Sequence, residues 1–320
     1  MVSWVFASIV ALSQPTTPPF HIPELSQPGA GVLGFATCDA SNLIVSNSKR
    51  RYSLQSVVKL LVGIAAFDAQ DRGTLRLSDK VTVSAKQRSV GYQPLEDELK
   101  HGRTFTTTWE DLVARAIQES DSMACDILLD KLGGPIAVQR FLDNRGIGGI
   151  NVDRYERELQ SETAGLVWRP EYADAKKYKA DFDRLTKADR DKAHKRYQVD
   201  PRDRSTPEAM CSLLKQLAEK TLLKPESCTR IMDILEGTVT YSDRLSAGIP
   251  DGWKFGHKTG SSGTWNGLAV ATNDVGIARR PDGSYVVLVA FLADSNLVME
   301  ERNAIIASFA RLNPLFKKDR

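Results

Sequence analysis

A serine followed three residues later by a lysine can form an activated nucleophile. Helical i, i+3 spacing places the amine one turn from the hydroxyl, where it can take the hydroxyl proton. The chain contains three copies: Ser46 with Lys49, Ser56 with Lys59, and Ser212 with Lys215. Only Ser56 follows a predicted strand pair and opens an apolar helix; Ser46 ends a strand, and Ser212 lies inside an amphipathic helix. The pattern therefore predicts Ser56 as nucleophile and Lys59 as its partner.

Two other segments carry hydroxyl and amine groups later in the chain. Helices are predicted over Trp109 to Leu132 and Pro135 to Asn144, and Ser120-Asp121-Ser122 follows the first turns of the former. Lys258-Thr259-Gly260 lies on a strand that is predicted to begin at Trp253. Taken alone, Ser120 could cap a helix end and Lys258 could face solvent. Their occurrence in this order after the Ser56 motif favours a shared catalytic site.

In this order the three segments resemble the serine penicillin-recognising hydrolases, and residues 31–315 resemble class A β-lactamases. Gly133-Gly134-Pro135 is similar to the family's turn after the Ser-Asp helix. The run from Arg154 to Leu159 resembles the family's Ω-loop signature, with Glu156 as the deacylating glutamate. His257 and Thr272 to Gly276 are similar to the extended-spectrum branch. An ion pair between Arg154 and Asp203 is expected to close the loop.

The resemblance assigns a role to each matched residue. Ser56 attacks the lactam carbonyl, and its proton passes either to Lys59 directly or to Glu156 through water. Ser120 then protonates the ring nitrogen with the help of Lys258. The remaining assignments are an oxyanion hole from the backbone N–H groups of Ser56 and Ser261, a carboxylate site formed by Lys258, Thr259, Ser261 and Arg244, and a cleft wall at Tyr92.

Several positions depart from the family pattern. Ser122 replaces an asparagine and is expected to be too short to reach substrate or Lys59, while Gln160 replaces a shorter asparagine that helps the glutamate hold water. Arg157 replaces a proline. Loops of this kind reach about 16 residues, but positions 154–203 span far more, and 18 of the 40 residues in 161–200 are charged. This insertion could form a lid or a solvated protrusion, and we favour the protrusion.

Composition excludes several other classes. The net charge of +3 over 320 residues gives no reason to expect nucleic acid or an anionic membrane as partner. The four histidines lack zinc-site spacing, so neither a metal nor another cofactor is expected. Cys38, Cys125, Cys211 and Cys228 are far apart and predict no disulfide framework; Cys125 and Cys211 are expected to be buried thiols. The expected partners are small β-lactams, and the expected state is a monomer.

The order of the predicted elements indicates a two-lobe α+β fold. Residues 31–52 and 236–315 are expected to form an antiparallel sheet lobe from both termini, flanked by helices, and residues 53–235 a mostly helical lobe inserted between them. Residues 14–30 contain five prolines and are expected to form a linker. Residues 1–13 could be a signal remnant, although no Lys or Arg precedes Lys49; a periplasmic or secreted location is expected.

Three functions are consistent with these residues. The first is β-lactam hydrolysis, in which a serine acyl-enzyme forms and Glu156 then activates the water that hydrolyses it. The second is a DD-peptidase-like or other serine hydrolase with weak lactam turnover, because Ser122 and Gln160 both alter positions that handle lactams. The third is a non-catalytic penicillin-binding sensor in which the acyl-enzyme persists.

Overall fold

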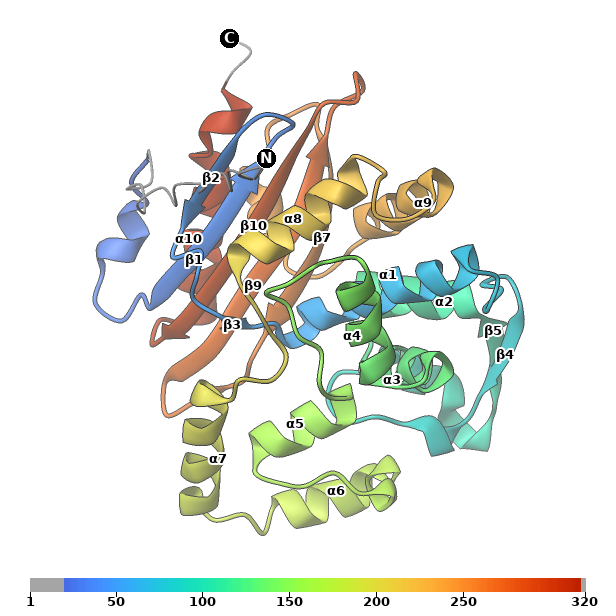
Figure 1. Ribbon diagram of the computed structural model, residues 1–320. Coiled ribbons are helices and arrows are strands. Elements are labelled where there is room, and N and C mark those ends of the chain that lie inside the picture. The colour runs from blue at the N-terminus through green and yellow to red at the C-terminus, as the bar shows by residue number, and fades with distance from the viewer. Residues whose placement is uncertain (1–19, 318–320) are drawn as a thin grey trace, which may run out of the picture.

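Apolar strands from both ends of the chain form one antiparallel sheet in the computed structural model, which describes residues 20–317 (Figure 1). The strand order is β2-β1-β10-β9-β7, and β8 pairs with β9. A sheet built from both termini is therefore confirmed. The strands are β1 Val32–Cys38, β2 Leu43–Ser46, β7 Lys254–Ser261, β8 Thr264–Trp265, β9 Leu268–Arg279 and β10 Tyr285–Ser295.

Helices fill the region between the N-terminal and C-terminal strands, as the two-lobe prediction requires. Most begin where a start signal stands in the sequence; Thr108, Thr186 and Thr206, for example, cap their helices with side-chain hydrogen bonds. The helices are α1 Val58–Asp71, α2 Trp109–Ala114, α3 Ser122–Leu132, α4 Pro135–Asn144, α5 Glu156–Ala164, α6 Ala175–Phe182, α7 Lys187–Val199, α8 Pro207–Ala218, α9 Pro225–Glu236 and α10 Met299–Arg311.

Two hydrophobic clusters cover the two faces of the sheet. On one face α10 packs against β9 and β10, and Phe35 contacts Phe309 with ring centroids 4.7 Å apart. On the other face α8 packs against β1 and β10, and α9 packs against β7. The second cluster continues from there into α1, most of which is buried. Because α8 and α9 belong to residues 53–235, part of that segment covers the sheet.

Two short ribbons join segments that are distant in sequence. Strand β3 Tyr52–Ser53 pairs with β6 Arg204–Ser205, and β4 Lys80–Val83 pairs with β5 Phe105–Thr108. The β3–β6 ribbon ties the chain just before Ser56 to the chain just after Asp203. The end of the predicted Ω-loop is thereby fixed beside the predicted nucleophile.

The N-terminal and cysteine predictions have different outcomes. The predicted signal remnant, residues 1–13, lies outside the described residues, and Pro23–Ser26 of the predicted linker forms a 3-10 turn. All four cysteines are buried free thiols, as expected for Cys125 and Cys211. Over residues 20–317 we find no helix with the length and apolar character that crossing a membrane requires.

Candidate active site

Ser56 and Lys59 meet at the beginning of α1. Ser56 lies in a 3-10 turn, Gln55–Val57, that leads directly into the helix. Lys59 Nζ lies 3.1 Å from Ser56 Oγ, and the lysine side chain is buried. In the competing copy of the motif, Lys215 instead donates to the backbone oxygen of Ala40. The contact predicted from the spacing is therefore present at the copy that opens the apolar helix.

Ser120 lies where the helical chain is interrupted. The helix predicted from Trp109 to Leu132 is not continuous, because a π-helical turn ends at Ser120, whose φ of +62° is left-handed. Asp121 then caps α3 and also accepts a hydrogen bond from the Leu95 backbone. The break directs Ser120 into the site: its Oγ accepts a hydrogen bond from Lys258 Nζ at 2.9 Å, and its carbonyl accepts one from Lys59 at 2.6 Å.

Ser122 contacts Lys59 directly, which corrects our expectation that it would be too short. Lys59 Nζ donates to Ser122 Oγ at 3.1 Å, and Ser122 Oγ donates to Glu156 Oε2 at 3.2 Å. The first residue of α3 lies close enough to both groups for a hydroxyl to bridge them. A longer amide is therefore not needed for this contact.

Glu156 is buried beside this hydroxyl. Its Oε2 lies 3.5 Å from Lys59 Nζ and accepts a hydrogen bond from Gln160 Nε2 at 3.3 Å, so the longer replacement side chain still reaches the glutamate. Glu156 is 2% exposed. Within the described residues, its Oε1 has no hydrogen-bond partner. One carboxylate oxygen is therefore held by Lys59, Ser122 and Gln160, while the other is free to accept a proton.

Asp126 holds the backbone that carries Glu156, and the sequence analysis did not identify it. Its carboxylate accepts hydrogen bonds from the backbone N–H groups of Glu156 at 2.7 Å and Arg157 at 3.0 Å, and from Ser89 Oγ at 2.6 Å. Complete burial raises the pKa of Asp126 to about 7. The available signal was its spacing, because Asp126 follows Ser122 by four residues on α3 and shares its face.

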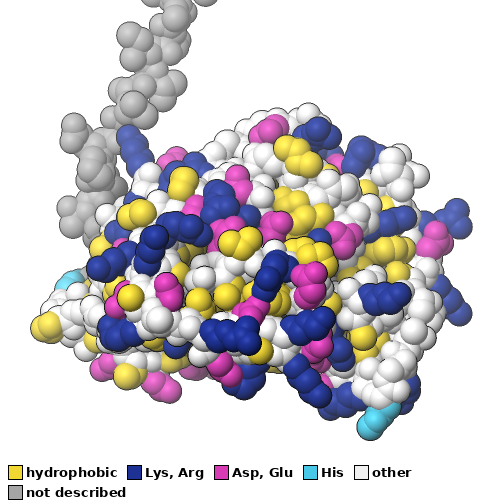
Figure 2. Space-filling view, turned by 90° about the horizontal axis from the view of Figure 1, so that it is seen from below, with side chains coloured by type: hydrophobic (Ala, Val, Ile, Leu, Met, Phe, Trp, Pro, Cys, Tyr) yellow, Lys and Arg dark blue, Asp and Glu magenta, His cyan; other side chains and the backbone are white. Residues whose placement is uncertain are grey.

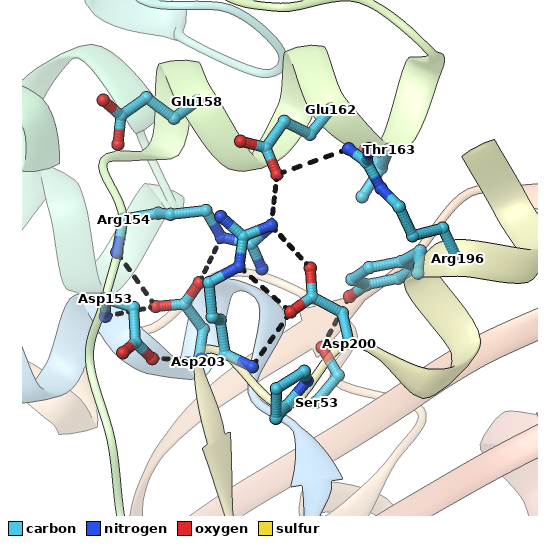
Figure 3. A network of polar contacts seen from close by, with 12 residues as sticks. Ser53, Asp153, Arg154, Glu158, Glu162, Thr163, Arg196, Asp200 and Asp203 are labelled. Carbon is cyan, nitrogen blue, oxygen red and sulfur yellow. Dashed lines mark hydrogen bonds and ion pairs between the residues drawn. The ribbon is translucent and has the colours of Figure 1, made fainter.

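The predicted Ω-loop is closed by the expected ion pair. Arg154 Nε donates to Asp203 at 2.6 Å, and both side chains are buried. Figure 3 shows that the guanidinium also faces Asp200 and Glu162, which lie 3.1 and 2.8 Å away. Arg154 therefore joins the start of the loop to both its first helix, α5, and its end.

The insertion packs against the site, which corrects our preference for a protrusion. Tyr197 of α7 is buried, and its hydroxyl forms hydrogen bonds with Ser53 and Gln55, directly before Ser56. Asp191, also on α7, accepts hydrogen bonds from Trp265 at 2.7 Å and Asn266 at 2.8 Å. The charged residues remain on the outer face, where Figure 2 shows basic and acidic side chains intermingled. One side of the insertion is thus solvated, and the other packs against the segment before Ser56 and against β8.

Lys258 and Thr259 lie on β7 beside α1. Lys258 is fully buried, and this burial, together with repulsion from Lys59, lowers the pKa of Lys258 well below its usual value. Thr259 shares a hydrogen bond of 2.7 Å with Thr240. At Gly260 a Cβ would lie 2.6 Å from the Leu54 oxygen and 3.2 Å from the Ser56 nitrogen. Only glycine permits this approach, which brings the backbone before Ser261 against that of Ser56.

Arg244 lies behind Ser261 and not at the cleft surface. It is fully buried, stacks on Tyr241 and donates to Ser261 Oγ at 2.7 Å and to the Asn273 carbonyl at 2.8 Å. Burial lowers the pKa of Arg244 to about 10. The sequence predicts that Arg244 contacts the substrate carboxylate directly. In the structure Arg244 instead holds the Ser261 hydroxyl. Tyr92 has a largely exposed side chain, and its carbonyl accepts a hydrogen bond from Ser122 N.

Comparison of the sequence with known proteins identifies one family. The model of the "Beta-lactamase enzyme family" matches residues 22–316. β-Lactamase VEB-1 of Pseudomonas aeruginosa is 28% identical over 285 residues, covering 88% of this chain and 83% of that protein. Extended-spectrum β-lactamase PER-1 of the same organism is 27% identical over 282 residues, covering 88% and 80%.

Solved structures give the same result. An ancestral class A β-lactamase, reconstructed for the last common ancestor of Gram-negative bacteria, has a TM-score of 0.72 and 29% identity, covering 91% of this chain and 96% of that one. A β-lactamase from Chitinophaga pinensis has a TM-score of 0.73 and 25% identity, covering 91% and 96%. Since the family model spans nearly all of the described residues, this chain belongs to the β-lactamase enzyme family, and its fold is that of class A.

Proposed function

We propose that this protein hydrolyses β-lactams through an acyl-enzyme on Ser56 that is released by water activated at Glu156. The observation that carries the proposal is a continuous set of contacts. Lys59 Nζ lies 3.1 Å from Ser56 Oγ and 3.5 Å from Glu156 Oε2; the Lys59 and Glu156 side chains are buried, and Ser56 is partly exposed, so that a substrate can reach it. The names of the relatives, all β-lactamases, support the same substrate class.

The first chemical step forms an ester. Lys59 takes the proton of Ser56 as Oγ bonds to the lactam carbonyl carbon, and the C–N bond breaks as Ser120 delivers a proton to the ring nitrogen. Lys59 is the group within direct hydrogen-bond distance of Ser56, which favours the direct route over transfer to Glu156 through water. The low pKa of Lys258, caused by its burial, suits it to exchange a proton with Ser120, 2.9 Å away.

The second step breaks the ester. Glu156 takes a proton from water as the water oxygen attacks the ester carbonyl, and Ser56 leaves with the proton held by Lys59. General-base assistance of this kind contributes about 10²–10⁴-fold in rate. Lys258, 2.9 Å away, returns a proton to Ser120 and regains one from solvent, and Glu156 releases the proton that it gained to solvent, so the site returns to its starting state. A buried carboxylate at this position favours turnover over a persistent acyl-enzyme.

Backbone and strand β7 bind the substrate in this scheme. The N–H groups of Ser56 and Ser261 bind the carbonyl oxygen as it becomes negative, which is often the largest contribution to catalysis. Lys258, Thr259 and Ser261 bind the substrate carboxylate, and Arg244 orients Ser261 through its 2.7 Å hydrogen bond.

The test is turnover of a chromogenic cephalosporin by Ser56→Ala. Loss of the nucleophile should lower kcat/KM by at least about 10³-fold. Ser212→Ala, which alters the exposed copy of the motif, is the matched control and should retain wild-type turnover. Full activity of Ser56→Ala would refute the proposal. Release of D-Ala from a peptide stem without lactam turnover would indicate a DD-peptidase, and one equivalent of product followed by no further release would indicate a sensor.

A further inference from the structure

A pocket of about 290 Å³ lies beside the candidate active site, and the insertion builds much of its wall. The lining includes Tyr178 of α6, Arg190, His194 and Tyr197 of α7, and Trp265 of β8. The pocket also touches three residues that adjoin the reacting groups. These are Gln55, which precedes Ser56; Gln160, which donates to Glu156; and Ser262, which follows Ser261.

This position decides which part of a bound lactam the pocket can hold. The ester carbonyl must lie between the N–H groups of Ser56 and Ser261, and the substrate carboxylate must lie along β7 near Thr259. In a β-lactam the ring nitrogen, which is on the side of the carboxylate, and the carbon that bears the amide substituent lie on opposite sides of the carbonyl carbon. The substituent therefore points away from Thr259, toward Gln55, Gln160 and Ser262. A substituent on that side enters the pocket.

The lining combines aromatic faces with one guanidinium. Arg190 lies over the Trp265 ring, 3.8 Å from its centroid, and over Phe182 at 4.9 Å. Asp191, the neighbouring carboxylate, is occupied by Lys187 at 2.8 Å and by Trp265. Among residues 20–317, no carboxylate lies within ion-pair distance of Arg190. Its charge is therefore held in place by stacking and remains available to an incoming anion.

His194 provides a second polar group in the same wall. Its Nε2 is buried and has no hydrogen-bond partner among the described residues. Burial lowers the pKa of His194, so the ring is neutral at pH 7; because its other nitrogen hydrogen-bonds the Leu268 backbone, Nε2 is left as an acceptor. A polar atom left without a partner in a pocket wall costs free energy unless a ligand or water contacts it.

The wall that carries these groups is fixed in position. Tyr197 forms hydrogen bonds with Ser53 and Gln55, and Trp265 donates one to Asp191, so α7 is anchored both to the segment before Ser56 and to β8. A preformed pocket loses little conformational entropy when it binds a ligand.

We propose that this pocket selects β-lactams whose acyl substituent contains an aromatic ring with a carboxylate, the ring packing against Tyr178 and the carboxylate pairing with Arg190. The inference rests on the proposed function, because it identifies the substituent by the position of the acyl group. It makes the insertion a specificity element of the enzyme.

The experiment compares benzylpenicillin with an analogue that carries a carboxylate on the phenyl ring. Dissociation constants are measured in full-length protein with Ser56→Ala, so that binding is separated from hydrolysis. We expect the analogue to bind about 10-fold more tightly than benzylpenicillin, as a charge-assisted hydrogen bond provides. Adding Arg190→Gln should remove this preference, so that the two ligands bind with the same Kd.

Lys195→Gln is the matched control, because Lys195 is an exposed cation on the same helix. It should leave both dissociation constants unchanged. An equal Kd for the two ligands, or a preference that survives Arg190→Gln, would overturn the inference. If the wild-type protein turns over lactams but shows no preference for the carboxylate analogue, only the pocket assignment is refuted. If the preference is present but lactams are not turned over, only the proposed function is refuted.

Discussion

At the scale of single residues, Asp126 fixes the backbone on which the proposed general base is carried. Its pKa of about 7 lies above the ordinary 3.8, because burial disfavours the charged form. The folded state therefore binds the proton more tightly than the unfolded chain does. It follows that the contribution of Asp126 to the free energy of unfolding is full at about pH 4 and is lost as the pH rises through about 7.

We therefore predict that Asp126→Asn flattens the pH dependence of stability. Between pH 5 and pH 8 the free energy of unfolding should fall more in the wild-type protein than in the variant, since the amide does not titrate. Urea denaturation at the two pH values measures the difference. Asp130→Asn, one turn later on α3 and exposed, should keep the wild-type slope. Equal slopes in wild type and Asp126→Asn would contradict the assignment.

The sequence predicts the reacting side chains better than the groups that hold them. Ser56 and Lys59 are recognisable because their chemistry needs a fixed spacing on one helix, and their contact is present at 3.1 Å. Asp126 acts on backbone N–H groups, which have no side-chain signature. Ser122 was misjudged because side-chain length alone does not give the distance between two helices.

At the scale of elements, the Ω-loop depends on Arg154. This buried guanidinium neutralises Asp203, Asp200 and Glu162, which come from both ends of the loop. Removing it leaves the buried Asp203 carboxylate without its cation, whereas Arg202 still pairs with Asp200 and Glu162. Breaking a buried ion pair in this way typically costs about 3–5 kcal/mol.

We predict that Arg154→Ala lowers the free energy of unfolding by an amount in that range and also reduces lactam turnover, because Glu156 lies in the same loop. Chemical denaturation measures the first effect and steady-state kinetics the second. Arg196→Ala removes a mostly exposed arginine 3.9 Å from Glu162 and should change stability by less than about 1 kcal/mol. Similar losses in the two variants would show that the buried network is not what closes the loop.

The boundaries of elements were predictable where local signals are strong. Pro135–Asn144 agrees with its predicted bounds, since proline begins the helix and the following polar residues end it. The break at Ser120 was missed, because the apolar period continues through it and tertiary contacts of Asp121 impose the turn. For the insertion, the sequence analysis favoured a protrusion over a lid, because its composition is dominated by its solvated face.

At the scale of the whole molecule, the fold follows from the order of strands and helices along the chain. Strands at both ends must pair with each other, and the helices between them must cover the sheet or pack together. The pocket beside the site was not predictable in this way. Its wall comes from α5, α6, α7, β8 and the segment before α1, and no sequence pattern specifies how such distant segments meet.

The central claim is that Ser56 forms an ester which Glu156 hydrolyses, and mass spectrometry of Glu156→Gln tests it most directly. After mixing with a penicillin, the variant should retain a covalent adduct of the full penicillin mass on Ser56 for minutes, because acylation proceeds while the water lacks its base. The wild-type protein under the same conditions should return to its free mass. A Glu156→Gln variant that forms no adduct, or that turns over at the wild-type rate, would contradict the account.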